Sequence, residues 1–194
     1  MSPATTSSRS TVVRSLHDVG PAVRSGGSLR GAVGLDGASG RGGDPTDRLP
    51  VATAGWARWA PVQAAAIGAH LVGGAVLLHR NRGRVAVQQG VGAGTTAKLV
   101  VTGAALLAAA RTGALGARTA AVDPVPTRSG VVPLPTTPGD VATLLQQLRV
   151  WQWVTPVLTG ALVVLTAQQG EQQEEGEGRG QARAGHGGLQ DQKL

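Results

Sequence analysis

Three stretches of the chain are apolar over the length that a membrane-spanning helix needs, and polar sequence separates and flanks them. A helix rises about 1.5 Å per residue, so roughly 20 apolar residues cross the hydrocarbon layer of a bilayer. The pattern predicts spans at about residues 60–78, 95–115 and 150–169. We therefore expect an all-α integral membrane bundle of three spans, with its transmembrane domain at residues 51–170.

The first span has the clearest boundaries, because no formal charge occurs between Arg58 and Arg80. The second is strongly apolar only over residues 99–110, and its full length takes in Lys98 and Arg111. Both side chains lie near an end and are long enough to reach the membrane surface. This segment is therefore interpreted as a span with a charged residue near each end.

The third span follows a proline-rich stretch at residues 119–138, which predicts an extended surface loop. After this loop, Val141, Leu144 and Leu148 recur at helical spacing with polar residues between them. The pattern predicts an amphipathic helix along the membrane surface that continues into the span.

Tryptophan and basic side chains favour the boundary between membrane and water, and such residues flank each predicted span. The predicted interface anchors are Trp56, Trp59, Arg80, Arg82, Arg84, Lys98, Arg111, Trp151 and Trp153.

The two ends of the chain, residues 1–50 and 171–194, are polar, rich in glycine and without a sustained apolar period. Such sequence buries too little apolar surface to offset the entropy of ordering, so both ends are predicted to be disordered tails. The bias toward Ala, Gly, Val and Arg also indicates a GC-rich coding sequence, in which start sites are easily misplaced. Residues 1–50 are thus either a tail or an upstream extension. Three spans place the two tails on opposite sides of the membrane, in an orientation that the basic residues do not decide.

Composition narrows the class of protein further. The 194 residues include no Cys, Phe or Tyr and four Trp, and the formal net charge is +7. Disulfides and thiolate chemistry are excluded, and a large soluble core is disfavoured because aromatic side chains supply much of the buried area in such cores. The arginines are dispersed through the tails and span ends, with no basic stripe interleaved with aromatic residues. We therefore expect no nucleic-acid partner.

Gln63 and His70 are the candidate polar residues within the membrane, and they share one face of the first span. An ionisable side chain at the centre of a span is costly unless it is paired. One interpretation is a proton-linked or ligand-contacting patch. The other is that both residues form hydrogen bonds with a neighbouring helix and hold the bundle together.

Small residues recur four positions apart within the first two spans and just before the second, a spacing that lets helix backbones approach closely. The pairs include Ala64/Gly68, Ala69/Gly73, Gly90/Gly94, Ala105/Ala109 and Ala109/Gly113. They favour tight association of helices, either within one chain or between copies.

The sequence gives no catalytic, cofactor or metal site. The four histidines lack the spacing of a ligand set, and Asp and Glu are absent from every predicted span. Residues 92–97 fit the glycine pattern of a dinucleotide loop, but the nearest acidic residue downstream, Asp123, lies too far along the chain and the flanking segments are apolar. We therefore expect a protein that is not an enzyme and has no cofactor.

The segments Trp59–Gln63, His70–Gly74, Arg82–Val85, Val150–Trp153 and Leu158–Leu162, closed by Gln168–Gln173, resemble the small uncharacterised multi-pass membrane proteins of GC-rich bacteria. The resemblance implies only a location, in the bacterial cytoplasmic membrane. It does not point to an activity. The expected partners are the lipid bilayer and a second copy or another membrane protein. The expected function is structural or accessory, and a small transporter or channel component using Gln63 and His70 is the alternative.

Overall fold

The computed structural model describes residues 3–87 and 91–190, with side chains described for residues 11–80, 82 and 94–168. The fold is almost entirely helical. Its elements are α1 (Pro3–Arg30), the π-helical turn η1 (Gly31–Leu35), α2 (Asp36–Ser39), α3 (Arg48–Val87), α4 (Val91–Ala120), β1 (Thr127–Ser129), β2 (Val132–Pro133) and α5 (Gly139–Gln190).

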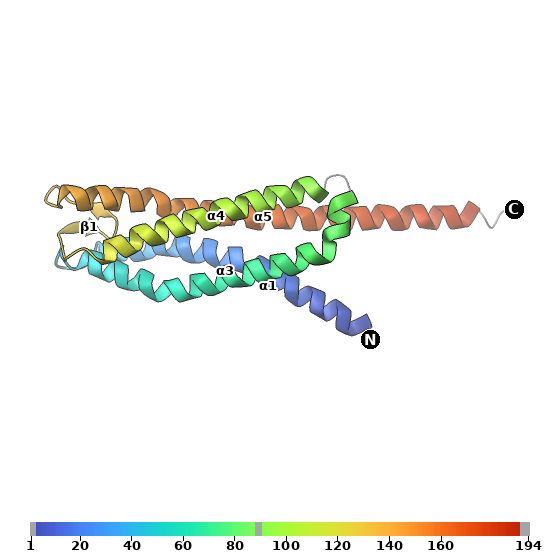
Figure 1. Ribbon diagram of the computed structural model, residues 1–194, viewed down its shortest axis with the longest axis horizontal. Coiled ribbons are helices and arrows are strands. Elements are labelled where there is room, and N and C mark those ends of the chain that lie inside the picture. Colours follow the sequence, from blue (N-terminus) through green and yellow to red (C-terminus); the bar gives the residue numbers. More distant parts are fainter. Residues whose placement is uncertain (1–2, 88–90, 191–194) are drawn as a thin grey trace.

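The four long helices α1, α3, α4 and α5 lie antiparallel to one another in chain order and form an elongated bundle (Figure 1). α1 packs along both α3 and α5, and α4 packs mainly on α5. The short strands β1 and β2 pair antiparallel beside the end of the bundle where α4 leads into α5. We call this the hairpin end.

Three helices in the described part of the chain are long and apolar enough to cross a membrane. They are Arg48–Arg80 in α3, Gly94–Ala120 in α4 and Gly139–Gln168 in α5. The predicted all-α fold with three apolar spans is confirmed, and this is the organisation of a multi-pass membrane protein. Each helix extends beyond the span predicted from the sequence, because polar residues at the helix ends continue the same backbone conformation.

The region predicted as an N-terminal disordered tail, residues 1–50, is instead helical over most of its length. α1, η1 and α2 follow one another without a break from Pro3 to Ser39, and α3 already begins at Arg48. The prediction was wrong here because it looked for an apolar stripe facing the bundle. The buried face of α1 consists of glycine, proline, arginine and serine, whereas large apolar residues such as Val12, Leu16 and Val19 are exposed.

Glycines let α1 lie close to α3. A Cβ atom added at Gly20 would meet the Ala66 carbonyl and His70, and one added at Gly27 would overlap the indole of Trp59. Glycine at this spacing therefore marks a helix contact rather than disorder.

α1 adds a fourth long helix to the bundle beside the three candidate spans, and this determines where the chain ends lie. The start of α1 and the far end of α5 lie at the same end of the molecule, opposite the hairpin end (Figure 1). The prediction of a C-terminal tail at 171–194 is met in part. α5 projects beyond the bundle there, but its backbone is helical as far as Gln190, and residues 191–194 lie outside the described residues.

The hairpin end contains two apolar clusters that join the loop to the helices. One consists of Leu49, Val141 and Leu145, and the other of Leu115, Val131 and Leu148. The amphipathic helix predicted before the third span has Val141, Leu144 and Leu148 on its apolar face. This face packs inward against the proline-rich loop. This loop is partly buried and is not a wholly exposed connection, because Thr127 and Val131 are enclosed by the helices.

Candidate functional site

His70 is buried at the interface between α3 and α1, with 9% of its surface exposed. Its Nδ1 atom lies 2.7 Å from the carbonyl oxygen of His17, and His17 Nδ1 lies 3.1 Å from the carbonyl oxygen of His70. The two rings are stacked, with their centroids 4.1 Å apart and an interplanar angle of 17°. We call this reciprocal arrangement the histidine pair.

Pro21 explains why the histidine pair forms at this point of α1. A proline inside a helix has no N–H group, so the carbonyl four residues earlier loses its helical partner. Pro21 lies inside α1, and that carbonyl belongs to His17. His70 Nδ1–H donates to this oxygen, and a hydrogen bond between helices replaces the missing bond within α1.

The geometry also places a proton on the Nδ1 atom of both rings. A carbonyl oxygen only accepts hydrogen bonds, so each Nδ1 atom of the histidine pair must carry the proton. The Nε2 atom of a neutral His70 is then an acceptor, and Thr102 Oγ1 on α4 lies 3.4 Å from it. His70 thus connects three helices, α1, α3 and α4.

Gln63, the other candidate polar residue, is half-buried on α3. Among the interactions of the described residues, none joins the side chain of Gln63 to His70. The polar partners of His70 come from α1 and α4, so the structure does not bring the two predicted residues together in one site.

A small cavity lies beside His70 at the centre of the bundle. Its volume is about 10 Å³, and residues of all four long helices line it: Pro21, Arg24, Ile67, His70, Thr102, Ala105, Leu106, Thr159 and Leu162. Arg24 is 5% exposed, and its Nε and Nη2 atoms are buried without a hydrogen-bond partner among the described residues. A buried guanidinium with open donors therefore adjoins the histidine pair.

A second buried polar group lies toward the hairpin end. Trp56 Nε1–H donates to Asp36 Oδ1 at 3.2 Å, whereas Asp36 Oδ2 is buried without a partner among the described residues. Ser39 Oγ donates to the backbone carbonyl of Asp36 at 2.8 Å and accepts from the Gly130 N–H at 2.9 Å. Burial raises the pKa of Asp36 to about 6, although the hydrogen bond from Trp56 opposes this shift.

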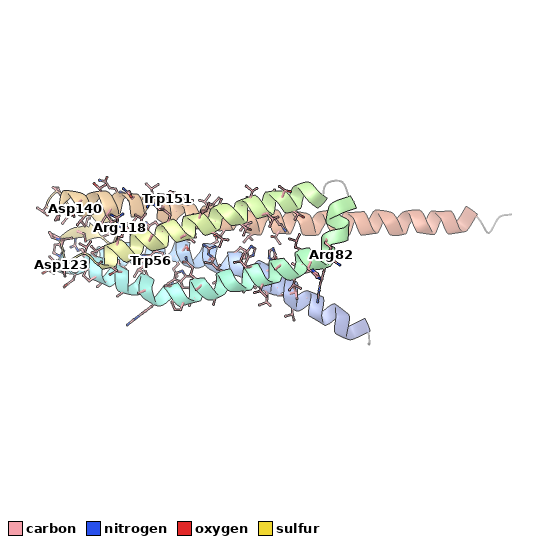
Figure 2. The ribbon with its side chains drawn as sticks, in the orientation of Figure 1. Trp56, Arg82, Arg118, Asp123, Asp140 and Trp151 are labelled. Atoms are coloured by element: carbon pink, nitrogen blue, oxygen red, sulfur yellow. The ribbon has the colours of Figure 1, made fainter. Side chains whose placement is uncertain are left out.

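The predicted interface anchors lie in different surroundings. Trp56 and Trp151 lie toward the hairpin end, and Arg82 lies toward the opposite end (Figure 2). Trp153 and Arg80 are exposed, and Arg111 is exposed with its Nη2 atom donating to Gln147 Oε1 at 3.1 Å. The side chain of Arg84 lies outside the described side chains.

Three of the predicted anchors have an additional contact inside the protein. The indoles of Trp56 and Trp59 cover Gly31 and Gly27 of the preceding helical segment. Lys98 is half-buried on α4 and interacts electrostatically with Asp18 of α1.

The small-residue pairs divide into two groups. Ala105 and Ala109 are buried inside the bundle, and a Cβ at Gly73 would meet the backbone of His17. By contrast, no described atom lies close to a Cβ built on Gly68 or Gly113. The pair Gly90/Gly94 lies partly outside the described residues.

Sequence reasoning missed His17, Arg24 and Asp36, because all three lie in the segment interpreted as a tail. A signal for them is present in the sequence. Pro21 follows His17 by four residues, and Gly20, Gly27 and Gly31 recur at helical spacing.

Comparison with known proteins adds no relative: no family model, no curated protein and no solved structure matches this chain.

Replacing His70 by leucine tests the histidine pair. H70L leaves the His17 carbonyl without a donor, and a buried unpaired acceptor costs about 1–3 kcal/mol. We expect the free energy of unfolding in detergent micelles to fall by about that amount, measured by tryptophan fluorescence during denaturation. H79L is the matched control, since His79 is exposed on the same helix. Equal stability of H70L and H79L would contradict the assignment.

The raised pKa of Asp36 predicts a pH-dependent stability. Because the folded protein binds the Asp36 proton more tightly than the unfolded chain does, stability from this group falls as pH rises from about 4 to about 6. D36N removes this loss, so above pH 6 the variant should be more stable than the parent protein by up to about 3 kcal/mol, and the gain should vanish near pH 4.

Unfolding measured across this pH range checks the prediction. D44N is the control, because the exposed Asp44 carboxylate accepts hydrogen bonds from Thr46, which hold its pKa below the usual value. D44N should show no gain above pH 6. A D36N variant that is no more stable than the parent protein at pH 7 would sink the prediction.

Proposed function

We propose that the protein is a structural or accessory component of the bacterial cytoplasmic membrane, which associates with a second copy of itself or with another membrane protein through small-residue faces of α3 and α4. The observation that carries this proposal is the division of the small residues into buried pairs and outward-facing ones. The buried pairs serve the bundle itself, and the outward-facing ones remain for a partner.

The outward faces have the composition of helix contacts in lipid. On α3, Ala64 and Gly68 are exposed one turn apart. On α4, Gly103, Leu107 and Ala110 are exposed along one face. Without a hydrophobic force between helices in lipid, close backbone approach at such residues is a main source of association. These faces therefore suit a packing partner.

The histidine pair supports the same proposal. Each Nδ1 atom is engaged by a backbone carbonyl, and the rings hold α1 against α3. This is the role expected of a polar group that fastens helices together. It favours the structural interpretation of His70.

A transporter or channel component is the second candidate function. The cavity that Arg24 and His70 line favours this class, since buried charged groups within membrane bundles commonly mark ion paths. Gln63, which this hypothesis also used, does not line the cavity.

Leucine at the open glycines tests the association. G68L and G103L add bulk on the outward faces without a clash inside the protomer, because no described atom outside the adjoining backbone of the same helix lies within 4 Å of a Cβ at either position. We expect at least a tenfold loss of self-association or of partner recovery, measured by energy transfer between labelled copies in liposomes and by co-purification.

G26L is the matched control, because Gly26 is equally open but lies on α1. Association that is unchanged in G68L and G103L would contradict the proposal, as would an equal loss in G26L.

A further inference from the structure

We propose that the cavity beside Arg24 binds one small halide ion, of the size of fluoride or chloride, at the centre of the bundle. The proposal rests on the buried guanidinium and its enclosure, and it does not depend on the association through α3 and α4.

The charge of Arg24 needs a counter-charge. A buried ion without a partner is strongly unfavourable, both in protein interiors and within membrane spans. No carboxylate lines the cavity, and no described carboxylate forms a salt bridge with Arg24. The described carboxylate nearest along α1 is Asp18, which is exposed and interacts electrostatically with His70 and Lys98.

The donors of Arg24 are open on the buried side. The Nε and Nη2 atoms have no hydrogen-bond partner among the described residues, so their N–H groups are available to an anion. The hydroxyl groups of the cavity are already engaged. Thr159 Oγ1 donates to the Thr155 carbonyl at 2.7 Å, and Thr102 Oγ1 pairs with His70 Nε2. The guanidinium is therefore the group that would hold the ion.

The size of the cavity selects the ligand. About 10 Å³ accommodates a particle of roughly the size of one water molecule. Carboxylate, sulfate and phosphate ions are too large for this space, whereas a monatomic anion is compact. The remaining walls are apolar, with Pro21, Ile67 and Leu162 among them. Apolar walls offer no competing counter-charge and strengthen the attraction between Arg24 and an anion.

Thermal stability in different salts tests the site. A ligand that binds only the folded protein raises Tm as its concentration increases. We expect the Tm of the full-length protein in nanodiscs to rise by several degrees with sodium fluoride or chloride, relative to sodium gluconate at the same ionic strength. Sodium iodide should have little effect because of its size. Broadening of the chloride-35 NMR line by the protein gives a second readout that needs no variant.

Two variants separate charge from packing. R24M removes the guanidinium and should abolish the halide effect on Tm, whereas R14M, at an exposed position on the same helix, should retain it. A105V fills part of the cavity and keeps Arg24, so it should weaken the halide effect even if R24M does not fold. Equal Tm values in chloride and gluconate, with no broadening of the chloride line, would overturn the proposal and assign the cavity to water. A halide effect that persists in both R24M and A105V would also overturn it.

Discussion

The carbonyl oxygen of His17 is the constraint on which the arrangement of the helices depends. Pro21 removes its partner within α1, and a carbonyl left unpaired inside a bundle destabilises the fold. His70 supplies the missing donor from α3, and His17 returns a hydrogen bond to the backbone of His70. This exchange fixes both the register and the separation of α1 and α3, since the two rings stack in the same contact. The helix with the least apolar character is thereby held beside the first apolar span.

The position of α1 has consequences for the whole molecule. It packs along α3 on one side and α5 on the other, so it joins the first apolar helix to the pair formed by α4 and α5. Ser25 on α1 donates to the carbonyl of Pro156 on α5 at 3.2 Å, which anchors the second of these contacts. Apolar residues of α1 face outward, and Arg24 and Ser28 face inward. Such a distribution suits lipid surroundings, in which helices associate through small and polar side chains.

The three apolar helices could be predicted from the sequence alone, because a long, uninterrupted apolar segment is a strong signal for a membrane span. His70 was also identified from its type and place alone. Its partner was not, since His17 lies in a segment whose composition is that of a disordered chain. Hydrophobic periodicity does not predict α1, because the face of this helix that packs against the bundle makes its contacts through glycine rather than through large apolar residues. Gln63 shares a helical face with His70, but no interaction among the described residues joins the two side chains. Which residues meet His70 depends on how the helices pack in three dimensions, and no local sequence pattern encodes that packing.

Disulfide trapping between α1 and α5 tests the central claim that α1 lies inside the bundle. The chain has no cysteine, and the Oγ atom of Ser25 lies 3.4 Å from the position of a Cβ built on Gly160, so the pair S25C/G160C is within reach of a disulfide. With a protease site inserted in the turn at residues 41–46, oxidation in native membranes should keep the two cleaved fragments together. The pair S15C/G160C should leave them separate, because Ser15 is exposed about three turns away on the same helix. Failure of S25C/G160C to form a disulfide, or equal trapping of both pairs, would contradict the account.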